Sequence, residues 1–347
     1  MSQEYTNERG RIRVTGFDTE AVEQREPLSE WAPTLESEEG KGRWHHAWRR
    51  FKNNRTALFG SVVIVFMMFL AIFARPIALP DQLPVLAGQV VQPFALAPYA
   101  PHLHDYGVTS QPPSAEFLFG TDWAGRDIFS RVLYGGRWSL SIGFIAVGLA
   151  VFIGVPLGAI AGYYGGWVDE TIMRLVDILY AFPFLVLAIA VVAIIGRGYW
   201  NMILALVIVG WLPYARIIRG EILSVKENEY VTAAEALGAR DRSIIFRHIV
   251  PNAMAPVIVQ ATLSVGTIVI AAAALGFLGL GLEPRSAEWG SMLSRGRDTL
   301  MRGQWWVTVF PGIAIFVFVM AINMVGDGVR DAFDPQADEG GAEGGFR

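Results

Sequence analysis

The hydrophobic positions of this chain gather in long unbroken runs that polar segments separate. Each run reaches the roughly 20 residues that a helix needs to cross a bilayer core of about 30 Å. Because lipid offers no hydrogen-bonding partner to backbone groups, such a segment can cross only as a helix. The pattern predicts an all-α polytopic membrane protein with six transmembrane helices, at 56–74, 138–164, 173–196, 199–218, 256–282 and 305–326.

The polar segments divide the chain around these spans. The first and last parts are acidic and lack the apolar periodicity of a packed core, so we expect disordered tails. Fifty-five residues precede the first span, so we expect a permanent helix rather than a signal peptide. The expected parts are an acidic tail (1–40), a basic flank and first helix (41–74), an external loop (75–137), a five-helix core (138–326) and a second acidic tail (327–347).

Charge gives the expected orientation. Only 17% of the 347 residues are charged, against about 25% in ordinary soluble domains. Basic residues favour the cytoplasmic side of a span, and they precede the first span at Lys41, Arg43, Arg49, Arg50, Lys52 and Arg55. A second basic group surrounds the loop after the fourth span, at Arg216, Arg219, Lys226, Arg240, Arg242 and Arg247. We therefore expect a multi-pass protein of the cell membrane with both termini in the cytoplasm.

The loop 221–251, between the fourth and fifth spans, has a helical pattern of its own. Lys226–Leu237 is rich in helix-forming residues, and Gly238 stands where a helix would stop in a left-handed turn. Asp241 then predicts the cap of a second short helix, which Pro251 would end. The product is a helix-turn-helix at the cytoplasmic membrane surface.

This helix-turn-helix is the expected contact with a partner that moves the spans. Small residues would let a partner backbone approach closely, and charged residues would fix its register. The alternative is an interfacial hairpin without a partner, since small residues and caps recur in any surface helix. The candidate coupling residues are Glu229, Ala233, Ala234, Glu235, Gly238, Arg242, Arg247 and Pro251.

Several residues of the spans are candidates for helix packing or gating. Gly158 and Gly162 form a small-xxx-small face that suits close helix packing, and Pro183 predicts a bend in the third span. Three glycines would loosen the external end of the fifth span, at Gly276, Gly279 and Gly281. Arg174 and Asp177 lie near one face of the third span and are expected to pair at the cytoplasmic interface.

The chain shows no chemistry of its own. It contains no G-x-x-x-x-G-K-[ST] phosphate loop and no H-E-x-x-H or cysteine–histidine cluster, so we expect no bound cofactor, no metal site and no catalysis. His102 and His104 could bind an external metal, but a solvated pair is the favoured interpretation. No nucleic-acid partner is expected; the expected surroundings are the lipid bilayer and other subunits.

Ala233, Ala234, Gly238 and Pro251 resemble the EAA loop of ABC-transporter permeases, although Thr232 stands where the family pattern begins with Glu. Longer stretches are similar to the C-type permease subunit of dipeptide and oligopeptide transporters, and they cover the chain in order between about 43 and 335. These stretches are 52–66, 117–143, 158–183, 276–294 and 305–335.

The resemblance implies a type I ABC importer permease. Its partners would be a second homologous six-span permease, two cytoplasmic P-loop ATPases that bind ATP and Mg²⁺, and an external substrate-binding protein. The loop 229–251 would seat in an ATPase, and the substrate would be a di- or oligopeptide, or alternatively nickel, a sugar or another small solute. A self-contained channel or secondary transporter would need ionisable residues at mid-membrane or an inverted repeat. A membrane enzyme would need a convergent catalytic site.

Overall fold

The computed structural model describes residues 4–7, 10–13, 43–74, 77–78, 90–92, 95–102, 105–283 and 286–334. The chain forms two compact units, residues 1–46 and 47–347. In the first unit, strands β1 (Glu4–Asn7) and β2 (Gly10–Arg13) pair as an antiparallel hairpin. These two strands are the described part of the segment 1–40, for which the disorder expected from the sequence stays a prediction. The rest of that segment and the end of the second tail, 335–347, lie outside the described residues.

The second unit is built mainly from helices. In chain order, the first helices are α2 (Arg43–Asn53), α3 (Arg55–Ile72), η1 (Tyr106–Val108), α4 (Ile128–Tyr164), α5 (Gly166–Tyr180) and α6 (Phe184–Ile195). Those that follow are α7 (Tyr199–Gly210), α8 (Leu212–Val225), α9 (Glu229–Ala236), α10 (Asp241–Ser243), η2 (Ile244–Ile249), α11 (Val250–Phe277), α12 (Trp289–Leu300) and α13 (Trp306–Phe333). A short antiparallel pair joins β3 (Ile77–Ala78) to β4 (Val90–Gln92).

Six segments of the described residues are long and apolar enough to cross a membrane, if one bent pair counts as a single span. Five are unbroken: Arg55–Ile72, Ile128–Tyr164, Tyr199–Val225, Asp241–Phe277 and Trp306–Phe333. The sixth joins α5 to α6 through a bend of 89°. Six spans were predicted, so the prediction is confirmed with this one break.

The break in the third span has a local cause. Pro183 stands at the N-terminus of α6 with φ −56°, and it has no N–H with which to continue the hydrogen bonding of α5. The residue before a proline is also biased away from helical conformation. The bend predicted at Pro183 is therefore present, and it reorients the chain between α5 and α6.

Three features of the fold differ from the prediction. The last helix, α13, continues to Phe333 and so includes the first residues of the predicted tail 327–347. α4 begins at Ile128, ten residues before the predicted start of the second span at 138, because Asp127 caps its N-terminus through the backbone N–H of Ser130 at 2.8 Å. The helix α12 was not predicted, because it is short and partly polar and so lacks the long apolar run that identifies a span. It begins after Glu288, whose side chain caps it.

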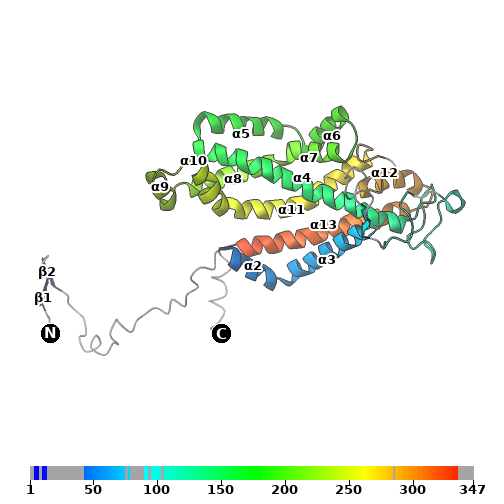
Figure 1. Ribbon diagram of the computed structural model, residues 1–347, viewed down its shortest axis with the longest axis horizontal. Coiled ribbons are helices and arrows are strands. Elements are labelled where there is room, and N and C mark those ends of the chain that lie inside the picture. The colour runs from blue at the N-terminus through cyan, green and yellow to red at the C-terminus, as the bar shows by residue number, and fades with distance from the viewer. Residues whose placement is uncertain are drawn as a thin grey trace, which may run out of the picture. The chain divides into compact units, whose positions relative to one another are not determined.

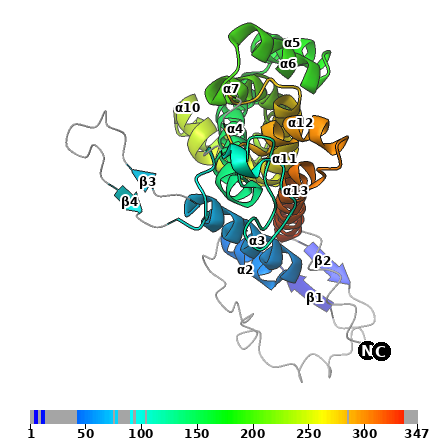
Figure 2. The same cartoon turned by 90° about the vertical axis from the view of Figure 1, so that its right-hand side faces the viewer.

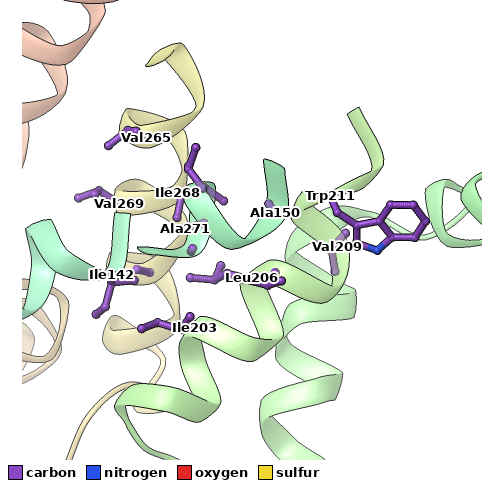
Figure 3. Packing of buried hydrophobic residues seen from close by; sticks show 14 of the residues in the cluster. Ile142, Ala150, Ile203, Leu206, Val209, Trp211, Val265, Ile268, Val269 and Ala271 are labelled. Carbon is purple, nitrogen blue, oxygen red and sulfur yellow. The ribbon is translucent and has the colours of Figure 1, made fainter. Parts of the chain in front are cut away.

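The long helices pack side by side. α13 lies along α3, and α4 contacts α7, α8 and α11 (Figures 1 and 2). Figure 3 shows Leu206 of α7 directed toward Ile142 of α4 and Ala271 of α11. Leu206 and Ile142 are both fully buried, so the centre of this unit is a packed apolar core rather than an open channel.

Candidate coupling segment and transport cavity

The coupling segment begins with a short helix that ends as the sequence predicts. α9 stops at Ala236, and Gly238 follows in the left-handed region with φ +77°. The N–H of Ala239 donates to the carbonyl of Ala234 at 3.0 Å, which is the hydrogen bond of a Schellman termination. The structure thus gives α9 a fixed C-terminal end at Gly238.

One face of α9 is anchored and the other is open. Val231 is fully buried, and α9 contacts the π-helix η2, where Ile245 and Ile249 are also buried. Leu237, which the sequence analysis did not single out, is 88% exposed at the tip. Of the predicted coupling residues, Ala234 is half-buried and the others are exposed, namely Glu229, Ala233, Glu235, Gly238, Arg242, Arg247 and Pro251.

Two side-chain contacts join this segment to the end of α4. The hydroxyl of Tyr163 donates to Oε1 of Glu235 at 3.2 Å. The Nζ of Lys226 donates to the carbonyl of Gly162 at 3.3 Å. Glu235 belongs to α9, whereas Lys226 is the C-terminal cap residue of α8. The hydrogen bond from Tyr163 to Glu235 therefore links α9 to the last turn of α4.

The predicted second short helix is wrong in its boundaries. Asp241 is the first residue of α10 and supplies no cap, and Pro251 does not end the helix, which continues from Asp241 to Phe277. The wide π-helical turn at Ile244–Ile249 ends two residues before Pro251. A π turn changes the hydrogen-bonding pattern of a helix, and this explains how the chain accommodates a proline there. The helix that begins at Asp241 therefore continues without interruption into the fifth span.

The predicted glycine face of α4 is a site of close packing. A Cβ on Gly158 would lie 2.2 Å from the carbonyl oxygen of Ala215 in α8, and one on Gly162 would lie 3.0 Å from that of Arg219. Gly154, which was not predicted, makes a similar approach to the carbonyl of Trp211. These contacts hold α4 and α8 backbone to backbone.

The glycines near the end of α11 do not loosen it as expected. A Cβ on Gly276 would lie 2.8 Å from Oε2 of Glu288, and one on Gly281 would lie 2.7 Å from the Cα of Gly276. Gly279 adopts φ +77° in the turn between them. The first two are therefore close-packing positions, and Gly279 is a turn position.

The predicted pair of Arg174 with Asp177 is wrong. Arg174 pairs with Glu170 one turn earlier in α5, at 3.0 Å, and both side chains are largely exposed. Asp177 instead accepts a hydrogen bond from Arg216 of α8 at 2.5 Å. Arg216 lies within the predicted fourth span, 199–218. The helix α8 extends this span to Val225 and brings Arg216 beside Asp177 of α5.

Arg216 and its neighbours make a polar contact between α5 and α8. The guanidinium of Arg216 lies over the ring of Tyr180, 4.2 Å from its centroid. A second pair joins Arg219 to both carboxylate oxygens of Asp169 at 2.5 Å. Two arginines within an otherwise apolar stretch are the sequence signal that could have identified these pairs.

A cavity of about 270 Å³ opens beside this contact. Apolar side chains of α4, α7 and α8 form part of its wall, and Tyr180, Phe182 and Phe184 line it at the bend between α5 and α6. Its polar groups come chiefly from one stripe of α11. That stripe consists of Gln260, Ser264 and Thr267.

A buried polar cluster fixes α12 at the opposite end of α11. Oε1 of Glu288 accepts from the N–H of Gly290 at 2.7 Å, and Oε2 accepts from the N–H and hydroxyl of Ser291 at 2.7 and 2.8 Å. Burial raises the pKa of the Glu288 carboxyl above its ordinary value, and these hydrogen bonds oppose that shift. The sequence analysis missed this cluster; a glutamate directly before an amphipathic helix is the signal that could have identified it.

Residues 154–339 match the family of binding-protein-dependent transport system inner membrane components, and residues 42–113 match the N-terminal transmembrane domain of oligopeptide transport permease C. The dipeptide transport system permease protein DppC of Alkalihalophilus pseudofirmus is 44% identical over 298 residues, which cover 84% of this chain and 90% of that protein. The glutathione transport system permease protein GsiD of Shigella boydii serotype 4 is 40% identical over 313 residues, covering 90% and 97%.

Among solved structures, the inward-facing methionine ABC transporter MetNI has a chain that is 21% identical, with a TM-score of 0.47, covering 58% of this chain and 96% of that one. The long family match and the high identity to DppC and GsiD identify a multi-pass membrane subunit that transports rather than catalyses, in a system whose ATPase is separate. The chain belongs to the family of binding-protein-dependent transport system inner membrane components, as a C-type ABC permease.

Proposed function

We propose that this chain is the C-type permease of an ATP-driven importer for di- or oligopeptides. Its relatives are named for dipeptide and glutathione transport, and both of these substrates are short peptides. In the proposed assembly it pairs with a second homologous six-span permease above two cytoplasmic P-loop ATPases, with ATP and Mg²⁺ bound by those ATPases. An external binding protein delivers the ligand, and both termini of this chain lie in the cytoplasm.

The coupling function is assigned to α9. The observation that carries it is the combination of a buried anchor and an open face on one short helix: Val231 is fully buried, whereas Ala233 and Leu237 are exposed. In this proposal α9 sits in a groove of one ATPase, and the contact from Glu235 to Tyr163 passes its displacement to α4. A lever must be rigid to transmit movement, and the fixed end at Gly238 supplies that rigidity.

A peptide suits the cavity better than nickel does. The described residues that line it include hydroxyl and amide groups but no Asp, Glu, His or Cys. Nickel is bound in proteins by several imidazole, thiolate or carboxylate ligands. The described residues of the cavity lining supply none of these, and the single carboxylate of Asp177 nearby is paired with Arg216. Aromatic walls with a few hydrogen-bonding groups instead match a short peptide backbone with neutral side chains.

The assembly is tested by purifying the chain from native membranes in mild detergent and identifying the accompanying proteins by mass spectrometry. We expect a second six-span permease and one or two P-loop ATPases. The matched control is the same chain carrying Gly238→Val, which should lose the ATPases and keep the second permease. Recovery of the wild-type chain alone, still active in reconstituted transport, would overturn the proposal in favour of a self-contained carrier.

The substrate class is tested separately. The complete complex, with its binding protein, is reconstituted in vesicles and supplied with radiolabelled glycyl-leucine as the probe. We expect uptake that requires both ATP and the binding protein. Uptake of Ni²⁺ without uptake of this or any other di- to pentapeptide would contradict the peptide assignment while leaving the ABC architecture in place.

A further inference from the structure

The ion pair between Arg216 and Asp177 lies well inside the membrane-spanning part of the chain. Arg216 comes nine residues before the end of α8 at Val225, which corresponds to about 14 Å along the helix axis. Asp177 comes eleven residues after the start of α5 at Gly166, or about 17 Å. Each charge therefore lies more than two turns inside the helix that carries it.

This pair is also open, in the sense that a large part of each side chain is exposed. The side chains of Arg216 and Asp177 are 46% and 62% exposed, whereas those of the neighbouring pair Arg219 and Asp169 are 32% and 19% exposed. Charged groups within a membrane span are costly to expose to lipid, so they face protein or a water-filled path. The neighbouring pair is more enclosed and fits a structural contact between α5 and α8; the open pair requires another explanation.

The open pair borders the cavity. Tyr180, which lines the cavity, lies one turn after Asp177 and directly beneath the guanidinium of Arg216. Across the cavity, Gln260, Ser264 and Thr267 follow one another at the four- and three-residue spacing of a single helix face. Within that stripe, Nε2 of Gln260 donates to the hydroxyl of Ser264 at 3.0 Å. The ion pair is thus connected to the cavity through Tyr180, and the row of neutral hydrogen-bonding groups on α11 lines the same cavity.

We infer that Arg216, Asp177 and the cavity beside them form a binding site for the zwitterionic backbone of a short peptide on its way through the permease. This inference rests on the proposed function and assigns residues to it. The guanidinium of Arg216 binds the C-terminal carboxylate, the carboxylate of Asp177 binds the N-terminal ammonium, and the α11 stripe contacts the peptide bond. When the peptide enters, the ion pair separates. The guanidinium of Arg216 then pairs with the peptide carboxylate instead of Asp177, and the carboxylate of Asp177 pairs with the peptide ammonium instead of Arg216. Neither side chain is therefore left without a partner of opposite charge.

The cavity limits the size of the occupant. Pockets that enclose small ligands usually measure about 300–1,000 Å³, and this one, at about 270 Å³, is at the lower end. A dipeptide with small or medium side chains fits this volume better than a long peptide does. The site holds its ligand through only two charged groups, which suits a path that must release its cargo.

The experiment compares Arg216→Gln with the matched control Arg219→Gln in the reconstituted complete complex. Uptake of glycyl-leucine is measured beside that of glycyl-leucinamide, which lacks the C-terminal carboxylate. Arg216→Gln should lower uptake of the acid about tenfold, the equivalent of one charge-assisted hydrogen bond, and that of the amide less than twofold. Because every complex uses the same binding protein, its own preference cancels in the ratio of the two peptides.

The outcomes separate the inference from the proposed function. Arg219 belongs to the more enclosed pair, so a purely structural effect should be at least as large for Arg219→Gln. Equal losses in the two variants, or an acid-to-amide ratio that Arg216→Gln leaves at its wild-type value, would overturn the inference while peptide transport stands. Failure of the wild-type complex to transport either peptide would overturn the peptide assignment itself.

A second measurement covers the case in which Arg216→Gln does not assemble. The chain has no cysteine, so Thr267→Cys introduces a single thiol in the cavity, and Val62→Cys introduces a control thiol on the exposed surface of α3. We expect a charged, membrane-impermeant methanethiosulfonate to modify the first and not the second during ATP turnover, as read by mass spectrometry of this chain. An unmodified Thr267→Cys would overturn the inference, because the cavity would then be closed to water by lipid or by the second permease.

Discussion

Gly158 of α4 lies against the backbone of Ala215 in α8, with no space for a side chain between them: a Cβ on Gly158 would be 2.2 Å from the Ala215 carbonyl oxygen. This approach is closer than any real Cβ contact, and the obstructing atom belongs to the backbone rather than to a flexible side chain. The two helices can therefore accept a larger residue only by moving apart. The contact between α4 and α8 therefore requires a residue without a Cβ at position 158.

Gly158→Val should destabilise the folded protein by about 1–3 kcal/mol, the usual effect of overpacking a well-packed contact. Gly148→Val is the control, because it lies in the same helix and a Cβ there meets nothing within 4 Å. Thermal unfolding of the detergent-purified protein measures the difference. A control that unfolds as early as Gly158→Val would show that glycine itself, and not the contact with α8, determines the effect.

Gly238→Val should weaken association with the ATPase while leaving membrane insertion normal. The native φ of +77° is open to glycine but strained for a β-branched residue, and the left-handed conformation costs on the order of 1–2 kcal/mol. Gly220→Val is the matched control, since both positions are open to a Cβ and only Gly238 has a positive φ. Co-purification of the ATPase is the readout; equal recovery with both variants would exclude α9 as the coupling element.

Glu288→Ala should destabilise the protein by about 1–3 kcal/mol, because it leaves the N–H groups of Gly290 and Ser291 buried without their acceptor. Burial raises the pKa of Glu288 in the folded state above its ordinary value of 4.5. The stability that this shift contributes is fully present below about pH 4.5 and is lost as the pH rises through the raised pKa.

The difference in unfolding temperature between the wild type and Glu288→Ala should therefore widen as the pH falls from neutral toward 4.5. Glu283→Ala is the control, since Glu283 is exposed, and its difference from the wild type should stay small across the range. A difference for Glu288→Ala that narrows on acidification would show that the hydrogen bonds outweigh burial and that the pKa is lowered.

The corrected ion pairs can be tested by double-mutant cycles. Alanine substitutions of Asp177 and Arg216 should be coupled by about 0.5–1 kcal/mol, a value set by the partial exposure of both side chains. Substitutions of Asp177 and Arg174 should be additive within about 0.3 kcal/mol, because Arg174 pairs with Glu170. Stability in detergent at low salt is measured for each cycle. A larger coupling energy between Asp177 and Arg174 than between Asp177 and Arg216 would support the pairing predicted from the sequence.

Much of the fold follows from local pattern. The apolar runs identify the six spans because lipid permits only helices there, and Pro183 and Gly238 act through their own backbone preferences. Gly158 could be recognised as a packing position from its spacing to Gly162. In each case the physical cause lies within a few residues of the position concerned.

The boundaries were less predictable. The expectation that a proline ends a helix fails at Pro251, because the π turn before it rearranges the hydrogen bonds. The start of α4 depends on a cap at Asp127 and on packing that extends the helix beyond its apolar run. A pattern of hydrophobicity contains neither kind of information.

The sequence by itself determined the membrane class, the six spans, the family and the position of the polar loop 221–251, since each of these depends on composition or on residues that are near neighbours in the chain. Only the tertiary structure decided that Asp177 pairs with Arg216, that Gly158 meets Ala215, and that the stripe of Gln260 lies across a cavity from the bend at Pro183. The reason is physical: an ion pair or a cavity wall depends on which faces of separate helices meet, and that is fixed by the packing of the whole bundle.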